Sequence, residues 1–186
     1  MSLLVCEPYN EPVRTIVLEP ASAEFEALLQ RRQALGQDLY DEVWEGEYHM
    51  APMARPSHGY VSRQLAVLLD PLVRQAGLVA TDPFNLGSPN DYRVPDGGVH
   101  RGLPATIFVP TAAIVVEVVS PGDETWQKLD FYAAHSADEL LIADPADRSI
   151  TWLVLHAGRY VEAEYSPLLG ITAAKLAEQI DWPATD

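Results

Sequence analysis

The stretch DYRVPDGGVHR (residues 91–101), followed by TAAIVVEVVSPGDETWQKLDFY (residues 111–132), decides the fold of this chain. Residues 112–119 form an apolar run rich in β-branched side chains, which predicts a central strand with both faces covered. Glu117 interrupts this run. A carboxylate in a buried strand costs several kcal/mol unless a cation, a metal ion or hydrogen bonds compensate it. We therefore expect Glu117 to have a compensating partner.

Two further charged residues flank the predicted strand. Asp96 stands between a proline and two glycines, a pattern typical of an acid exposed where a strand bends or begins. Lys128 falls on a helix predicted after a Ser-Pro-Gly turn, with Asp123 as a candidate N-cap. Spacings of three or four residues put Lys128 and Tyr132 on one face of that helix. This spacing predicts that Lys128 faces back toward the end of the Glu117 strand.

The order of these elements resembles the PD-(D/E)XK nuclease superfamily, whose pattern is P-D, an apolar strand carrying E, and a lysine. More narrowly, the chain is similar to the Uma family of restriction-endonuclease-like proteins, in which the lysine lies on the next helix, within K-x-x-x-Y. The segment GEYHMAP (residues 46–52) and His58 match further parts of that family's pattern. The resemblance covers roughly residues 40–155. Val119 stands where the E-x-K pattern places lysine, so Lys128 takes that role by the Uma-like spacing alone.

This resemblance implies a metal-dependent endonuclease that hydrolyses phosphodiester bonds, with DNA as the expected substrate. Asp96 and Glu117 would bind Mg²⁺ or Mn²⁺, hard ions that prefer oxygen ligands. Lys128 would orient the attacking water or neutralise charge in the transition state. The remaining candidates for the site are His58, Glu47 and Tyr132. We expect Glu47 and Tyr132 to support the site or pack against it.

Each candidate also has a structural interpretation. A lone Glu117 is more often the partner of an arginine, Asp96 alone would be a turn residue, and Lys128 alone a solvated charge. For His58, a functional role and a place in the first helical turn facing water are equally open. His135 is expected to cap the C-terminus of the Lys128 helix. Other chemistries lack support, because the sequence has no G-x-S-x-G, H-E-x-x-H, cysteine pair or P-loop.

The length and composition of the chain limit the class of protein to which it can belong. It has 186 residues, 48% of them hydrophobic and 21% charged, which predicts one soluble domain (residues 21–186) behind an N-terminal arm (residues 1–20). Cys6 is the only cysteine, so no internal disulfide can form. No apolar stretch approaches the ~20 residues that a bilayer crossing needs, and the N-terminus lacks a signal-peptide pattern. We expect a cytoplasmic protein.

The formal net charge of −15, from 27 acidic and 12 basic residues, is unusual for a protein that binds a polyanion. Affinity for generic DNA is therefore expected to be weak. The charge favours an alternative function, a catalytically inactive nuclease-fold module for binding or assembly, whereas the presence of Asp96, Glu117 and Lys128 together favours the enzyme. A homodimer is the expected assembly, because a duplex presents two strands to be cut.

The hydrophobic pattern predicts an α+β fold, a mixed β-sheet flanked by helices with a restriction-endonuclease-like core. Ser57 is the predicted N-cap of the strongest amphipathic helix, in which Pro71 is expected to cause a kink or a new turn. The predicted strands are residues 13–18, a hairpin over 41–50 turning at Glu45-Gly46, 79–84, 92–100, 112–119, 139–143, 150–155 and 160–164. The other predicted helices begin at Ser22 and Asp123 and cover residues 172–180.

Overall fold

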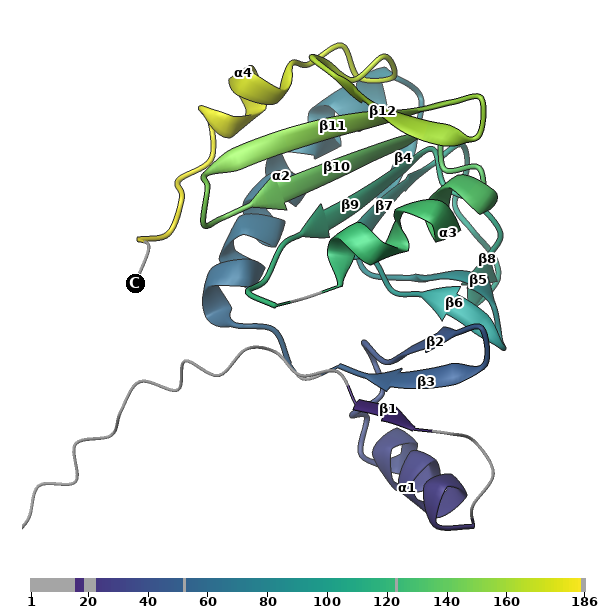
Figure 1. Cartoon of the computed structure of the whole chain (residues 1–186). Coiled ribbons are helices and arrows are strands. Elements are labelled where there is room, and N and C mark those ends of the chain that lie inside the picture. The colour runs from purple at the N-terminus through teal and green to yellow at the C-terminus, as the bar shows by residue number, and fades with distance from the viewer. Residues whose placement is uncertain (1–15, 19–22, 52, 123, 185–186) are drawn as a thin grey trace, which may run out of the picture.

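The computed structural model describes residues 16–18, 23–51, 53–122 and 124–184, whose strands form two mixed sheets with helices packed around them (Figure 1). The strand orders are β1-β3-β2-β6-β5-β8 and β12-β11-β10-β9-β7-β4. In chain order the elements are β1 (Ile16–Leu18), α1 (Ala23–Ala34), β2 (Glu42–Trp44), β3 (Glu47–Met50), α2 (Pro56–Gln75), β4 (Val79–Thr81), β5 (Asn85–Ser88), β6 (Asp91–Arg93), β7 (Gly97–His100), β8 (Phe108–Val109), β9 (Ile114–Val118), the 3₁₀ turn η1 (Thr125–Lys128), α3 (Leu129–Ala134), β10 (Glu139–Asp144), β11 (Ser149–His156), β12 (Arg159–Ala163) and α4 (Ala173–Ala177).

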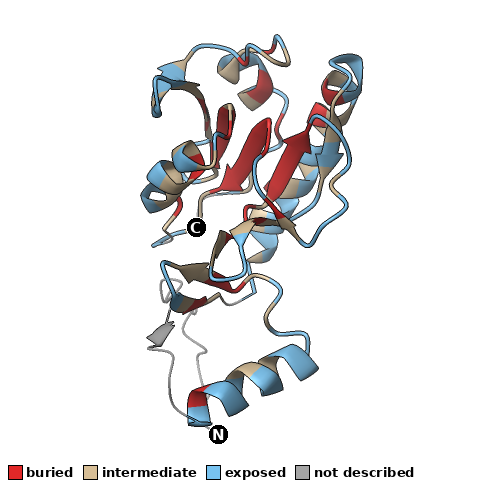
Figure 2. Cartoon of the chain, turned by 90° about the vertical axis from the view of Figure 1, so that its right-hand side faces the viewer, coloured by how far each residue is buried: buried red, intermediate tan, exposed pale blue. Residues whose placement is uncertain are grey.

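Strand β9 is an inner strand of the sheet β12-β11-β10-β9-β7-β4, as its apolar sequence predicts. It pairs in parallel with β10 and antiparallel with β7, and all five of its residues are buried (Figure 2). Alternate residues face opposite sides of the sheet. Val116 packs in the core beneath α2, whereas Val115 packs with Tyr132 of α3 on the other side. Glu117 therefore faces the α3 side.

Helix α2 covers one face of this sheet because an apolar residue recurs along it every four positions. Val61, Leu65, Leu69 and Val73 are all buried. The helix begins at Pro56, one residue before the predicted N-cap, since a proline at the first helical position loses no hydrogen bond. The helix also continues through the exposed Pro71 to Gln75 without a break in its assignment.

The β2–β3 hairpin turns at Glu45 and Gly46, as predicted, and both have positive φ, 51° and 91°. Such a two-residue turn matches the twist of the flanking strands. The register sets Glu42 directly opposite His49. Strand β1 pairs with β3 of the same chain, and the remainder of the predicted arm, residues 1–15 and 19–20, lies outside the described residues, as does Asp123.

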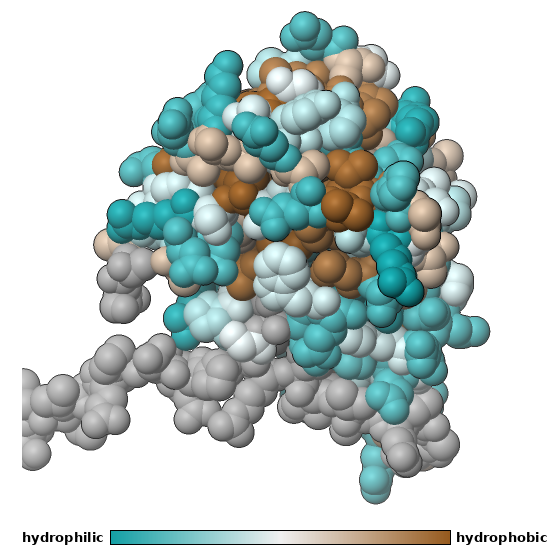
Figure 3. All heavy atoms as spheres, turned by 45° about the horizontal axis from the view of Figure 1, so that its top comes forward, coloured by the Kyte–Doolittle hydropathy of each residue, from teal (hydrophilic) through white to brown (hydrophobic). Residues whose placement is uncertain are grey.

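The predicted fold class is confirmed, and so are the hairpin, α1, α2 and the strands and helix that follow β9. One mixed sheet was expected, but the strands divide between two sheets, and β5 and β8 were not predicted. Apolar residues reach the surface in patches between hydrophilic ones on the face shown in Figure 3. Among the described helices, none combines the length and apolar character needed to cross a membrane.

Gly87 of β5 gives a first testable prediction about this fold. Its φ is 125°, and a Cβ at this position would overlap the carbonyl oxygen of Asp91 and lie 2.9 Å from the Phe131 ring. Backbone strain and overpacking therefore add, so Gly87→Ala should lower the free energy of unfolding by about 3 kcal/mol. Urea denaturation would measure the change. Gly102→Ala is the control, with open space around it and an expected change within about 0.5 kcal/mol. Equal stabilities for the two variants would contradict the prediction.

Candidate active site

Asp96 and Glu117 lie side by side at one end of the central sheet. Asp96 immediately precedes β7, whose Gly97 pairs with Val116 of β9, and both Asp96 and Glu117 line the same pocket. Asp96 Oδ2 also accepts a hydrogen bond of 2.8 Å from the backbone N–H of Val118. This bond holds the Asp96 carboxylate over the end of β9.

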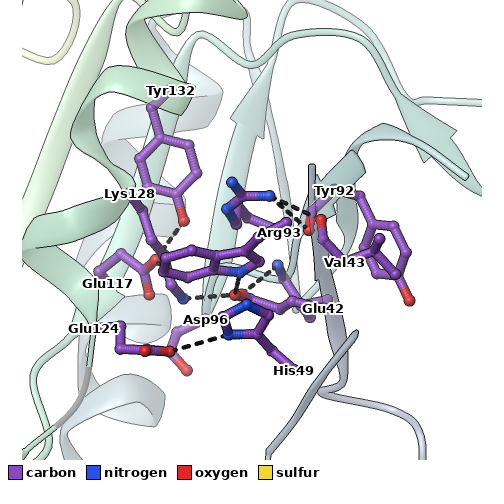
Figure 4. A network of polar contacts seen from close by, with 12 residues as sticks. Glu42, Val43, His49, Tyr92, Arg93, Asp96, Glu117, Glu124, Lys128 and Tyr132 are labelled. Atoms are coloured by element: carbon purple, nitrogen blue, oxygen red, sulfur yellow. Dashed lines mark hydrogen bonds and ion pairs between the residues drawn. The ribbon is translucent and has the colours of Figure 1, made fainter. Parts of the chain in front are cut away.

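Glu117 is only 4% exposed and receives two donors from the helical segment that follows β9 (Figure 4). The Tyr132 hydroxyl donates to Glu117 Oε1, and Lys128 Nζ lies 3.4 Å from the same oxygen. Burial raises the pKa of Glu117 to about 7, an effect that the Lys128 charge opposes and the Asp96 charge reinforces. Burial likewise raises the pKa of Tyr132, so its hydroxyl keeps the proton that it donates.

Lys128 lies between two carboxylates contributed by different sheets. Its Nζ is 2.9 Å from Glu42 Oε1 as well as 3.4 Å from Glu117 Oε1, and the lysine side chain is 13% exposed. Burial alone would lower the pKa of Lys128, but the charges of Glu117 and Glu42 outweigh it and raise the pKa above its ordinary value. The amine therefore stays charged, and the two carboxylates are held on either side of it.

Glu42 is the site residue that the sequence did not reveal. Besides Lys128, it accepts hydrogen bonds from the backbone N–H of Val94 and from Trp44 Nε1, each at 2.7 Å. The same hairpin also carries Glu47, the predicted candidate, which is exposed at the start of β3 and does not line the pocket of the other site residues. Both are glutamates of one amphipathic hairpin, and only the docking of that hairpin onto the core distinguishes them.

His58 joins the first turn of α2 to the carboxylate end of the site. Its Nε2 lies 2.8 Å from Asp96 Oδ1, and its Nδ1 lies 3.0 Å from the Ser120 hydroxyl. A neutral ring protonated at Nε2 satisfies both contacts, donating to Asp96 and accepting from Ser120. The structure thus brings His58, Asp96, Glu117, Lys128 and Tyr132 together.

A column of stacked rings and charges supports the junction of the two sheets next to the site. The buried Arg93 guanidinium lies 4.3 Å from the Trp44 ring centroid and 4.0 Å from that of Phe131. His49 stacks on the far side of Trp44 at 4.4 Å. His135 stacks on Phe131 and places Nδ1 2.9 Å from the Phe131 carbonyl, so its predicted capping position is confirmed. The column fixes Trp44, which in turn holds Glu42.

Asp96, Glu117, Lys128 and His58 all line one pocket of about 420 Å³, whereas Tyr132 lies behind Glu117. The donor atoms offered by the two carboxylates are oxygens, which suits a hard cation. No hydrogen bond to Glu117 Oε2 comes from a described residue. Within the described ranges, no three acidic, histidine or cysteine side chains are grouped to hold an ion. Two carboxylates nevertheless fit Mg²⁺, which usually keeps several waters and takes only one or two carboxylates from the protein.

Comparison with known proteins gives a family match and a structural match. The profile of a family described as "Uma2: Putative restriction endonuclease" matches residues 23–182. A crystal structure described as a "putative nuclease belonging to DUF820", from Anabaena variabilis ATCC 29413, is similar to this chain with a TM-score of 0.62. The sequence identity is 15%, over 75% of this chain and 90% of that chain, so this likeness shows the fold alone. No curated protein matches the chain significantly.

Proposed function

This chain belongs to the Uma2 family, and from that membership we propose that it is a metal-dependent endonuclease that hydrolyses phosphodiester bonds of DNA. The observation that supports the proposal is that Asp96 and Glu117 meet in one pocket at the end of the sheet, with Lys128 beside them. A buried acid with a pKa near 7 is costly to maintain for packing alone, and such groups cluster at functional sites.

Asp96 and Glu117 are the residues that would hold Mg²⁺ or Mn²⁺. When bound, such an ion lowers the pKa of a coordinated water and stabilises charge on the phosphate. Glu117 is oriented by Tyr132 and Lys128, and Asp96 by the Val118 N–H and His58. The ligands are therefore fixed before an ion arrives.

Lys128 is placed to stabilise the negative charge that develops during phosphodiester hydrolysis. It is a permanently charged donor in a largely water-excluded site, where electrostatic interactions are stronger than in water. Glu42 prevents the amine from turning fully toward Glu117, because it holds Nζ at the shorter distance. His58 positions Asp96, and its contact with Ser120 ties both to the turn after β9. We also propose that the protein acts as a homodimer.

Thermal unfolding with and without Mn²⁺ tests the proposed function. An ion present at 100 times its Kd should stabilise the protein by about 2.7 kcal/mol. Asp96→Asn removes a ligand, so both this stabilisation and Mn²⁺-dependent cleavage of DNA should be lost. Asp130→Asn is the matched control, since Asp130 is exposed on α3 and outside the pocket. Stabilisation by Mn²⁺ without cleavage of any nucleic acid would favour the binding or assembly module instead.

A further inference from the structure

A second cavity continues from the candidate active site along α2. It measures about 550 Å³ and lies between α2 and the strands β4 and β7, of which β4 is the last strand of its sheet. Asp96 and Ser62 line both this groove and the site pocket. The two hollows therefore meet at one of the two proposed metal ligands. We call the second cavity the α2 groove.

Apolar and small residues form most of the α2 groove. Its walls include Leu65, Ala66 and Val67 of α2, and its other side includes Ala80 of β4 and the Gly97–Gly98 pair of β7. Val67 is 63% exposed, and Ala66 and Ala80 are exposed as well. A flat organic group such as a nucleobase gains more from this surface than a phosphate does, because apolar contact favours the base.

The reactive side chains are recessed at the junction of the two hollows. The exposed fractions of the side chains alone are 5% for Glu117, 13% for Lys128 and 19% for Asp96. A phosphate must enter the pocket to reach them. Cavities of 420 and 550 Å³ are of the size that encloses a small ligand, so each suits individual nucleotides rather than stacked base pairs.

The charges of the chain also disfavour binding to duplex DNA, which has two phosphate backbones. Binding to duplex DNA depends on cations that neutralise many phosphates. Here several of the described cations pair with acids of the protein itself, among them Arg74 with Asp70 at the α2 groove. The other described pairs of this kind are Arg32–Asp41, Arg93–Asp91, Arg101–Asp138 and Lys128–Glu42.

We propose that the substrate reaches the site as a single polynucleotide strand, which lies along α2 with its scissile phosphate at Asp96 and neighbouring nucleotides in the pocket and the α2 groove. This inference rests on the proposed nuclease function and specifies its substrate. The apolar walls of the groove favour contact with unpaired bases, because the bases of a duplex are stacked and paired with one another. A paired duplex would have to open before cleavage.

Cleavage assays on the full-length protein with Mn²⁺ test this proposal. The substrates are one oligonucleotide as single-stranded DNA, as its RNA equivalent, and annealed to its complement as a blunt duplex. The kcat/KM for at least one single-stranded form should exceed that for the duplex by about tenfold or more, a difference of 1.4 kcal/mol. Equal or faster cleavage of the duplex would overturn the inference and leave the nuclease function standing.

Charge variants locate the path of the strand. Ala66→Glu places a negative charge in the α2 groove and should raise KM for the single strand about tenfold with little change in kcat. Gln75→Glu adds the same charge to the same helix outside both hollows and should leave KM within about twofold. Ala80→Trp fills the groove without charge and should also raise KM. Stabilisation by Mn²⁺ should be unchanged in all three variants.

Three results would count against the inference. If Ala66→Glu and Gln75→Glu have the same KM, the strand does not follow the α2 groove. If Mn²⁺ stabilises the protein but no strand is cut, the groove serves no cleavage reaction. If Mn²⁺ neither stabilises the protein nor supports cleavage, the proposed nuclease function fails, and the inference falls with it.

Discussion

Exchange of Glu117 for glutamine is expected to lower metal-dependent cleavage on the order of 1,000-fold and, at the same time, to stabilise the metal-free protein above pH 7. The activity is lost because the neutral amide is a weaker ligand for Mg²⁺ or Mn²⁺ than the charged carboxylate that it replaces. The stability rises because a buried charge is removed while the amide oxygen still accepts the Tyr132 hydroxyl bond. We expect a gain of about 1–3 kcal/mol.

The direction in which the stability of the parent protein changes with pH also tests this prediction. The pKa of Glu117 is about 7 in the folded protein against an ordinary value of 4.5. Between these values the folded state binds more protons than the unfolded state, so this group's contribution to stability is full below pH 4.5 and is lost as the pH rises through 7. In Glu117→Gln, the free energy of unfolding should not fall in this way as the pH rises through 7.

Urea titrations of the parent and of Glu117→Gln at several pH values, without metal, would measure the difference. Glu162→Gln is the matched control, because Glu162 is exposed on β12. If Glu117→Gln is instead strongly destabilised at every pH, Glu117 serves as the structural ion-pair partner of Lys128, and its proposed role as a metal ligand is wrong.

Exchange of Lys128 for methionine should reduce turnover by about 100-fold or more, the loss seen when one preorganised donor to a transition state is removed. It should also lower the free energy of unfolding at neutral pH by about 3–5 kcal/mol, because Glu42 and Glu117 would then face each other without a cation. Lower pH should restore part of this stability as Glu117, whose pKa is raised by burial, takes up a proton.

Lys175→Met is a control for this variant, since Lys175 is the other lysine of the chain and is exposed on α4. Mn²⁺ should still stabilise Lys128→Met, because both proposed ligands remain and the ion supplies the missing positive charge. Kinetic assays, urea titrations and thermal shifts would measure these effects. Parent-like turnover in Lys128→Met would exclude the lysine from catalysis.

The central strand and the helices could be predicted because local patterns specify them. Strand β9 is a continuous apolar run, α2 repeats an apolar residue every four positions, and the β2–β3 turn contains Gly46 at positive φ. The division into two sheets was not visible, because it depends on short contacts between distant segments. The pairing of β2 with β6, for example, has only Val43 and Tyr92 in register.

The candidate site shows the same limit. Asp96 and Glu117 can be predicted because a proline–glycine context and an acid in an apolar run are unusual locally, whereas Lys128 is predicted from the resemblance to the family spacing alone. The sequence predicts Glu47 from the family resemblance and not Glu42, because the two glutamates lie on the same face of the β2–β3 hairpin and only the docking of the hairpin decides which of its ends meets the core. Lys128 likewise gave no sign in the sequence that it is buried between two acids.

The position of Glu42 ties the chemistry of this protein to the completeness of its folding. Glu42 comes from one sheet, and the lysine that it holds comes from the segment after β9 in the other. During synthesis the β2–β3 hairpin leaves the ribosome well before Lys128, yet it can engage that lysine only after the later strands have assembled. A partly folded or truncated chain would carry the acids without their amine in place. Such a chain would lack the arrangement of charges that the proposed reaction needs, so the site is complete only once both sheets have folded.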